Sequence, residues 1–204
     1  MSAKDRTYNH KEVITFRSTK HRYGGLSNMA SGYTIKVNDI IIKSSEALYQ
    51  ACRYPHLPEI QELILAESNP MLAKQLSKKY YNQSRKDWDN VKFKVMYWCL
   101  QVKLSQNWES FYKVLASTDD KPIVEYSKED KVWAACPVNN SQLKGVNALG
   151  RLLMQLREEY VLQGNFLDCV EPPEINNFKL LGFDIETACS PSIELEADHF
   201  VAIA

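Results

Sequence analysis

The longest stretch of helical periodicity in this chain of 204 residues runs from Trp88 to Asn107. Its apolar residues recur every three or four positions, the spacing that keeps them on one face of an α-helix: Trp88, Val91, Val95, Trp98 or Cys99, and Val102. Asp87 precedes the stretch and can cap it. We therefore predict one long helix, around which the other elements have to be arranged.

Shorter elements are expected on both sides of this helix. Strands are predicted over residues 13–18, 122–127 and 179–185, with a hairpin that turns at Asn38-Asp39. Helices are expected after the start signals Pro58, Asn69-Pro70 and Asn147, the last one ending at Gly164. The segment 128–145 is rich in polar and small residues and is predicted to be a loop. Few strands among many helices indicate the α+β class: a single helix-rich domain with a small antiparallel sheet.

The length and the 45% hydrophobic content are those of one domain with a sizeable core. We assign it to residues 13–164, preceded by a polar, flexible N-terminus over residues 1–12 and followed by an acidic C-terminal extension over residues 165–204. Residues 1–164 hold 24 Lys and Arg against 17 Asp and Glu, whereas the extension holds one Lys against eight acids. A basic body suits phosphate-bearing ligands, although an ordinary mixed surface with an acidic tail explains the pattern equally well.

No apolar run approaches the length of a membrane span, and the charged N-terminus has no apolar signal core. We therefore expect a soluble, cytoplasmic protein without membrane contact. The five cysteines are scattered and contain no CxxC pair. Reduced thiols are favoured over a disulfide framework, and a structural zinc site is not indicated.

The segment from Ser44 to Arg53 places several polar groups on one helical stripe. Glu46, Tyr49, Gln50 and Arg53 share a face at 3.6 residues per turn, while the apolar residues between them point elsewhere. Such a stripe lines a pocket or forms the solvent side of a surface helix, and these ten residues alone favour the second interpretation.

Three further motifs carry residue types found in binding sites. Glycines in Tyr23–Asn28 allow close approach of a ligand to the backbone, although a plain turn is the commoner explanation. Trp88 follows two cations at a helix start, although for a single Trp a core role is the commoner explanation. Asp130 and Trp133 lie in a predicted loop, and loop aromatics near acids often hold a sugar or a base.

A carboxylate, stacking aromatics and phosphate-binding cations are what cleavage of an N-glycosidic bond requires. Positive charge grows on the ribose ring as its bond to nitrogen breaks, and a nearby carboxylate stabilises this charge and orients water. The four histidines are isolated, so a His-based triad or a zinc hydrolase is poorly supported. No metal motif, Rossmann fingerprint or Walker loop is present, and no cofactor is expected.

Taken in order, these motifs resemble the NADAR or YbiA-like N-glycosidase family over roughly residues 16–160. The resemblance rests on many short motifs in register: Tyr23-Gly24 with Leu26-Ser27-Asn28, Ser45-Glu46 with Tyr49-Gln50-Ala51, Asn69-Pro70 with Ala73-Lys74, Arg85 with Asp87-Trp88, Lys103 with Gln106, Val124-Glu125, Asp130 with Trp133, and Gly145–Met154 with Arg157. No single motif is decisive, but their number in register is specific. It favours the pocket interpretation of the Glu46 stripe.

The resemblance implies a helix-rich α+β fold that hydrolyses N-glycosyl bonds of ADP-ribose or ribose-phosphate conjugates. One branch of the family acts on riboflavin-pathway intermediates. Another removes ADP-ribose from guanine in DNA or RNA, as an antitoxin to a toxin ADP-ribosyltransferase, which is then an expected partner from the same operon. We expect the guanine substrate slightly ahead of the riboflavin intermediate.

By position, the family's functional residues fall on Glu46 and Asp130 as catalytic acids and on Trp88 and Trp133 for stacking. Substrate contacts are further expected from a larger set, in which Arg85, Arg151 and the Gly24–Asn28 loop contact phosphate: Tyr23, Gly24, Ser27, Asn28, Tyr49, Gln50, Arg53, Arg85, Asn147 and Arg151.

The sequence departs from the family pattern in three places. Ala47 stands where histidine is usual, Arg53 where lysine is usual, and Ala134-Ala135 where glycine is usual. Arginine cannot form a Schiff base with an opened ribose, as some family members are thought to do through lysine. The chain then uses direct water attack or another lysine, with Lys43 as the candidate nucleophile. The alternative is a non-catalytic module that binds ADP-ribose or a related nucleotide.

Overall fold

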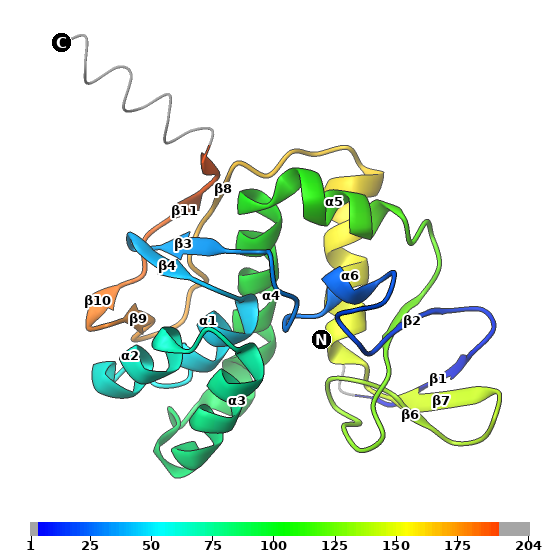
Figure 1. Cartoon of the computed structure of the whole chain (residues 1–204), viewed down its shortest axis with the longest axis horizontal. Coiled ribbons are helices and arrows are strands. Elements are labelled where there is room, and N and C mark those ends of the chain that lie inside the picture. Colours follow the sequence, from blue (N-terminus) through cyan, green and yellow to red (C-terminus); the bar gives the residue numbers. More distant parts are fainter. Residues whose placement is uncertain (1–3, 192–204) are drawn as a thin grey trace, which may run out of the picture. The chain divides into compact units, whose positions relative to one another are not determined.

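The computed structural model describes residues 4–191, which divide into two compact units. The first unit consists of residues 4–30 and 109–165, and the second of residues 31–108 and 166–191. The helices and short strands form the mixed α and β architecture expected from the sequence (Figure 1).

The first unit contains two small sheets. β1 (Arg6–Asn9), β7 (Gln142–Gly145) and β6 (Cys136–Pro137) form an antiparallel sheet in the order β1-β7-β6. β2 (Ile14–Phe16) pairs in parallel with β5 (Ile123–Glu125). Between them a buried cluster forms from residues distant in sequence: Tyr8, Val124, Ala135 and Leu143. The helical elements are η1 (Gly24–Leu26), most of α5 (Trp108–Ala116), α6 (Ala148–Arg157) and its π-helical continuation η3 (Glu158–Leu162).

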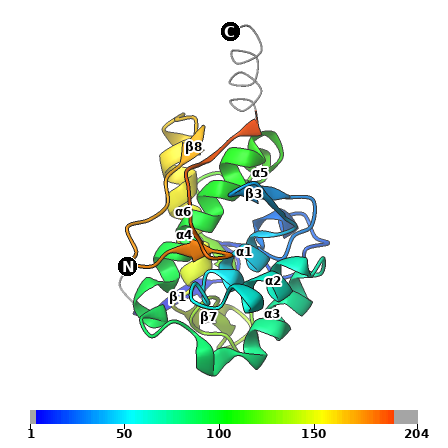
Figure 2. The same ribbon diagram turned by 90° about the vertical axis from the view of Figure 1, so that its left-hand side faces the viewer.

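The second unit is built on the long helix α4 (Trp88–Gln106). Helix α1 (Ser45–Ala51) contacts α4, α2 (Pro58–Ala66) and α3 (Pro70–Lys79) (Figures 1 and 2). The hairpin of β3 (Ile35–Val37) and β4 (Ile40–Ile42) leads into α1, and the turn η2 (Tyr81–Gln83) joins α3 to α4. Residues 166–191 contain four two-residue strands: β8 (Cys169–Val170), β9 (Lys179–Leu180), β10 (Phe183–Asp184) and β11 (Ala188–Cys189).

Local sequence signals explain where these helices begin. The Ser44 hydroxyl accepts a hydrogen bond from the Ala47 N–H, and Asn69 Oδ1 accepts one from the Met71 N–H. Pro58 and Pro70 occupy first-turn positions, where no N–H is needed. Asn38 and Asp39 both adopt positive φ, as the predicted two-residue hairpin turn requires.

Asn147 lies at the predicted start of α6 but does not cap it with its side chain. Its Nδ2 donates to the Ile123 carbonyl, and its Oδ1 accepts from the Glu125 N–H. The residue therefore ties α6 to β5, while its own backbone adopts a left-handed conformation with φ of 50°.

Several expectations need correction. Residues 6–9 form β1 because they pair with β7, so the flexible N-terminus does not include them; residues 1–3 lie outside the described residues. The predicted loop 128–145 contains β6 and the whole of β7. The strand expected over residues 179–185 is the β9–β10 hairpin, since Leu181 and Gly182 both adopt positive φ and reverse the chain. The antiparallel sheet is accompanied by the parallel β2–β5 pair, which the hydrophobic pattern did not indicate.

The expectation of reduced thiols is wrong for two of the five cysteines. Cys169 and Cys189 form a disulfide, whereas Cys52, Cys99 and Cys136 are free and buried. Direct opposition of the two residues in the β8–β11 pair brings them together. Within residues 4–191, no helix has the length and apolar character needed to span a membrane.

Candidate active site

The polar stripe of α1 lies inside the second unit rather than facing solvent. Every residue of α1 is buried, and the side chains of Glu46 and Gln50 belong to residues only 5% and 4% exposed. The solvent-facing interpretation of this helix is therefore wrong. Because burying a carboxylate or an amide is costly without hydrogen bonds, the stripe has to be held by defined partners.

A chain of hydrogen bonds orients the Glu46 carboxylate. Gln50 Nε2 donates to Glu46 Oε1 at 2.8 Å, and the Ser77 hydroxyl donates to Gln50 Oε1 at 2.6 Å. The Tyr54 hydroxyl donates in turn to the Ser77 carbonyl at 2.6 Å. The amide is fixed at both ends, so Glu46 receives its donor from one direction.

Arg53 lies just beyond α1 and stacks on aromatic rings. Its Cζ is 4.8 Å from the ring centroid of Trp88 and 5.3 Å from that of Tyr81. Its Nε is buried without a hydrogen-bond partner among the described residues. A guanidinium held in this way is a preformed cation for an anionic group.

Trp88 and Tyr49 pack behind this cation. Trp88 is only 5% exposed, and its ring centroid lies 5.0 Å from that of Tyr49. Burial raises the pKa of Tyr49 well above its usual value, which the charge of Arg53 opposes and that of Glu46 reinforces. Since Arg53 covers one face of Trp88, stacking of a base on that face would require the guanidinium to move.

Arg85 is engaged mainly within the protein. Its Nε and Nη2 donate to the two carboxylate oxygens of Asp87 at 2.6 and 3.0 Å, which lowers the pKa of Asp87. Nη2 also donates to the Asn176 carbonyl at 2.6 Å, and Nη1 donates to that of Asn177 at 3.3 Å. Four of its five N–H donors are thereby used, which leaves little capacity for the predicted phosphate contact.

Two lysines of the second unit differ sharply in environment. Lys43, the candidate nucleophile, is exposed after β4. Lys103 of α4 is fully buried, its Nζ lies 4.2 Å from the ring centroid of Tyr33, and burial lowers its pKa well below the usual value. Burial therefore favours the neutral amine of Lys103, whereas Lys43 lies at the surface.

The first unit carries the second group of predicted residues. Asp130 Oδ1 accepts hydrogen bonds from the backbone N–H groups of Val132 at 2.9 Å and Trp133 at 2.8 Å. The Val132 and Trp133 carbonyls then accept from Ala148 and Leu149 in the first turn of α6. Asp130 therefore shapes the turn that joins half-buried Trp133 to the start of α6.

The remaining predicted residues of this unit lie at two places. Asn147 is fully buried, and half-buried Arg151 follows it in the first turn of α6. The Tyr23–Asn28 motif forms the turn η1, with Ser27 and Asn28 buried and Tyr23 beside the Arg22 guanidinium. A Cβ on Gly24 would collide with the Thr19 backbone, so this glycine is needed for contact with the protein's own chain.

Each unit thus brings together a part of the predicted set. Glu46, Tyr49, Gln50, Arg53 and Trp88 assemble in the second unit; Asp130, Trp133, Asn147 and Arg151 lie around the start of α6 in the first. Sequence reasoning missed Tyr54, Ser77 and Tyr81, which hold this group from outside α1. Only Ser77 had a signal, its spacing of four from Ala73 on the buried face of α3.

A pocket of about 460 Å³ is lined by Pro172–Phe178, Asp184 and Ile185, and none of the predicted site residues lines it. In residues 4–191, no three His, Cys, Asp or Glu side chains gather in a way that would hold a metal ion. We therefore take the residues around Glu46 as the candidate active site.

Comparison with known proteins identifies the class to which this fold and these residues belong. The NADAR domain model matches residues 15–161. The chain therefore belongs to the NADAR family.

Named relatives cover most of the chain. It is 34% identical to N-glycosidase YbiA of Escherichia coli over 151 residues, which is 74% of the chain and 90% of that protein. An N-glycosidase of Nostoc punctiforme is 33% identical over 149 residues. A riboflavin biosynthesis protein of Vibrio vulnificus is 28% identical over 92% of the chain but only 55% of its own length.

The NMR structure of E. coli YbiA is similar to this structure with a TM-score of 0.64 at 32% identity. The match covers 74% of this chain and 86% of that one. The similarity confirms the predicted fold and the family resemblance.

Proposed function

We propose that this protein is an N-glycosidase that hydrolyses the bond between ribose C1′ and nitrogen in an ADP-ribose or ribose-phosphate conjugate. The observation that carries the proposal is the buried Glu46 carboxylate, oriented by Gln50 in the same group as the stacked Arg53. Membership of the NADAR family and relatives named as N-glycosidases support it.

Glu46 is assigned to the reacting carbon. As the C1′–N bond breaks, its electron pair leaves with the base, and the carboxylate stabilises the positive charge on the ribose ring. A water molecule then bonds to C1′ and gives a proton to Glu46, which passes that proton on to the departing nitrogen and so returns to its ionised form. This direct route needs no lysine at the position of Arg53.

Arg53 is assigned to an anionic group of the substrate, a phosphate of the conjugate. Trp88 and Tyr81 flank its guanidinium and reduce the freedom that binding would otherwise have to remove. The predicted contacts of Trp133, Asn147 and Arg151 stay predictions.

Removal of ADP-ribose from guanine in DNA or RNA remains the first choice of substrate, with the riboflavin precursor second. The excess of Lys and Arg over residues 1–164 favours a charged polymer, because several cations can meet several phosphates. The Vibrio relative named for riboflavin biosynthesis favours the small metabolite. A toxin ADP-ribosyltransferase is a proposed partner only in the first case.

The test is to incubate the protein with an oligonucleotide bearing ADP-ribosylated guanine and, separately, with the aminated pyrimidine precursor of riboflavin, following both by mass spectrometry. Loss of ADP-ribose from the oligonucleotide selects the first substrate, and cleavage of the precursor selects the second. Binding of ADP-ribose without cleavage of either compound would replace the enzyme by the non-catalytic binding module.

A further inference from the structure

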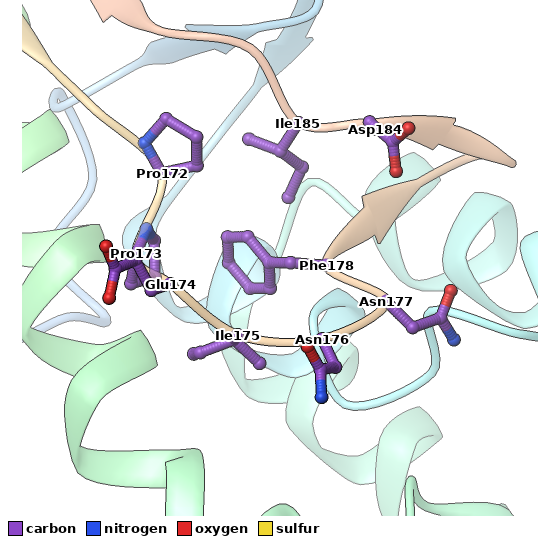
Figure 3. Close-up of a pocket in the computed structure, with 9 residues that line it drawn as sticks. All are labelled: Pro172, Pro173, Glu174, Ile175, Asn176, Asn177, Phe178, Asp184 and Ile185. Atoms are coloured by element: carbon purple, nitrogen blue, oxygen red, sulfur yellow. The ribbon is translucent and has the colours of Figure 1, made fainter.

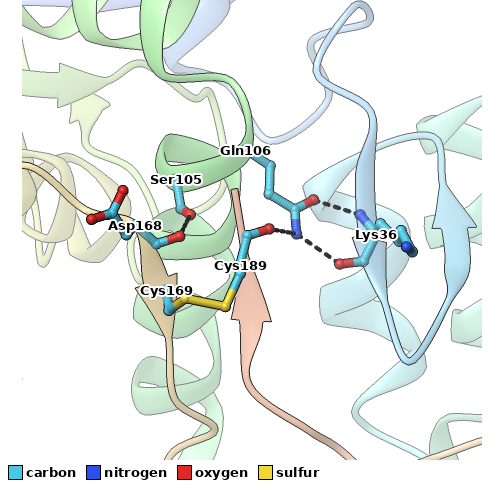
Figure 4. The surroundings of a disulfide bond; sticks show 6 residues. All are labelled: Lys36, Ser105, Gln106, Asp168, Cys169 and Cys189. Carbon is cyan, nitrogen blue, oxygen red and sulfur yellow. Dashed lines mark hydrogen bonds between the residues drawn. A yellow bond between two sulfur atoms is a disulfide. The ribbon is translucent and has the colours of Figure 1, made fainter. Parts of the chain in front are cut away.

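The segment 166–191 folds onto the second unit as a closed loop, which we call the brace. It lies outside the residues matched by the family model. The Cys169–Cys189 disulfide joins its two ends. Next to the disulfide, Ser105 donates to the Asp168 carbonyl at 2.7 Å, and Gln106 donates to the Cys189 carbonyl at 3.0 Å (Figure 4). The ends of the brace are therefore anchored at the end of α4.

The middle of the brace is fixed by packing. Phe178 contacts Trp98 of α4 edge to face, with ring centroids 5.1 Å apart. Figure 3 shows Phe178 and Ile185 directed toward the space inside the loop, while Asn177 is directed away from it. Asn177 has a φ of 52°, a left-handed conformation that turns the chain here.

The first connection from the brace to the polar stripe runs through Arg85. Its guanidinium donates to the carbonyls of Asn176 and Asn177, as described above. Its backbone N–H donates to the Arg53 carbonyl at 3.0 Å, and its carbonyl accepts from the Trp88 N–H at 3.1 Å. One buried residue thus links the brace to both members of the Arg53–Trp88 pair.

The second connection runs through Gln61 of α2, which is completely buried. Its Nε2 donates to the Lys179 carbonyl of the brace at 2.9 Å and to the Ala51 carbonyl of α1 at 3.0 Å. Its Oε1 accepts from the Leu181 N–H at 2.6 Å. All three bonds are directed to backbone, so this amide sets a spacing between two chain segments.

Both connections end at the same place, the C-terminal end of α1. We propose that Arg85 and Gln61 are positioning residues through which the disulfide-closed brace holds Arg53 in its substrate-binding position. This inference rests on the proposed function of the stripe. It gives the segment beyond the family match a role in substrate affinity, and it replaces the phosphate contact expected of Arg85.

The kinetic test compares three variants of the full chain on whichever of the two compounds, the ADP-ribosylated oligonucleotide or the pyrimidine precursor, the wild type cleaves. Gln61→Met removes the amide bonds at similar volume, Arg85→Lys removes the forked bonds, and Cys189→Ser opens the brace. Each is expected to raise KM about tenfold while kcat changes less than about threefold, because Glu46 is untouched and Arg53 is displaced.

The matched control is Lys94→Gln. Lys94 also donates to a brace carbonyl, that of Glu174 at 3.1 Å, but it is exposed on α4 and leads to neither Ala51 nor Arg53. It is expected to keep the wild-type KM. Equal KM values in Gln61→Met, Arg85→Lys and wild type would overturn the inference, as would an equal rise in the control.

A second measurement needs no turnover and so separates this inference from the proposed function. A dithiol reductant converts the Cys169–Cys189 disulfide to two thiols and is itself oxidised to a disulfide; Cys169 is exposed to it. Amide hydrogen exchange over residues 45–54 is expected to speed up at least about threefold on reduction, with residues 148–157 of the first unit as the unchanged reference.

Unchanged exchange over residues 45–54 would refute the coupling between the brace and the polar stripe, even in an active enzyme. Faster exchange in a protein that cleaves neither substrate would uphold the coupling and refute the proposed function.

Discussion

The two acids predicted to be catalytic are held in opposite ways in the two units. Glu46 is buried, and its carboxylate accepts from a side-chain amide that is itself fixed by Ser77. Asp130 is half-buried, and one of its oxygens accepts from two successive backbone N–H groups. The first arrangement orients a carboxylate, whereas the second uses a carboxylate to shape a turn.

This difference distinguishes an acid that can take part in the reaction from one that stabilises the surrounding loop. A carboxylate that accepts hydrogen bonds from two backbone N–H groups stabilises the loop whether or not a substrate is present. Burying a carboxylate reduces the free energy of unfolding. A buried carboxylate is therefore expected mainly where function needs it. Glu46 is accordingly the acid to which we assign the reaction, and Asp130 the acid that places Trp133.

The largest expected effect is that of Glu46→Gln. The amide keeps the size of the side chain but cannot stabilise a ribosyl cation or accept a proton, so kcat is expected to fall about 10³-fold. Binding of ADP-ribose, measured by calorimetry, is expected to change little. A variant with wild-type turnover would remove Glu46 from the mechanism.

Arg53 strengthens the contrast between the two acids, because it places a cation in the same group as Glu46. Arg53→Gln is expected to raise KM about tenfold to a hundredfold, the range for losing a hydrogen-bonded charge pair with phosphate. Arg53→Lys restores the charge without the fork and is expected to recover part of the affinity. Steady-state kinetics at two salt concentrations would measure these KM values. A wild-type KM in Arg53→Gln would contradict the assignment of Arg53 to a phosphate.

What the sequence predicted of the fold depends on how local the signal is. The α4 periodicity, the Asn69 cap and the Asn38-Asp39 turn are set by neighbouring residues and are confirmed. The pairing of Thr7 with Lys144, or of Thr15 with Val124, depends on segments more than a hundred residues apart, and periodicity contains no such information.

The same division applies to the candidate site. Glu46, Tyr49 and Gln50 follow from helical spacing, and the structure shows that their stripe is buried. Ser77 of α3 supports the stripe, and the carbonyls of Asn176 and Asn177 hold Arg85 beside it, through tertiary contacts that no spacing rule predicts. Asp87 was predicted as a cap, but it binds Arg85 instead.

Burial of Lys103 in the core of the second unit disfavours the charged form of its amine. Burial lowers its pKa, so the unfolded chain binds more protons than the folded one between the lowered value and about 10.5. Stability is therefore expected to rise with pH across that window. Lys103→Met, which removes the charge at similar volume, should raise the free energy of unfolding at pH 7 by about 1 to 3 kcal/mol.

Urea titrations of both proteins at pH 7 and pH 9 measure this effect. The difference between wild type and Lys103→Met is expected to narrow at the higher pH. A difference that stays constant would show that Lys103 keeps the same charge in the folded and unfolded states throughout.

The smallest expected effect concerns Asp130, and it decides whether the two acids really differ. Asparagine keeps an oxygen that can accept from the Val132 and Trp133 N–H groups, whereas alanine does not. Asp130→Asn is expected to retain stability and turnover within about threefold, and Asp130→Ala to lose about 1 kcal/mol of unfolding free energy. Thermal unfolding and kcat, measured on both variants, distinguish the roles. If Asp130→Asn loses turnover as completely as Glu46→Gln while remaining stable, Asp130 takes part in the reaction, because only its charge and its ability to accept a proton have been removed.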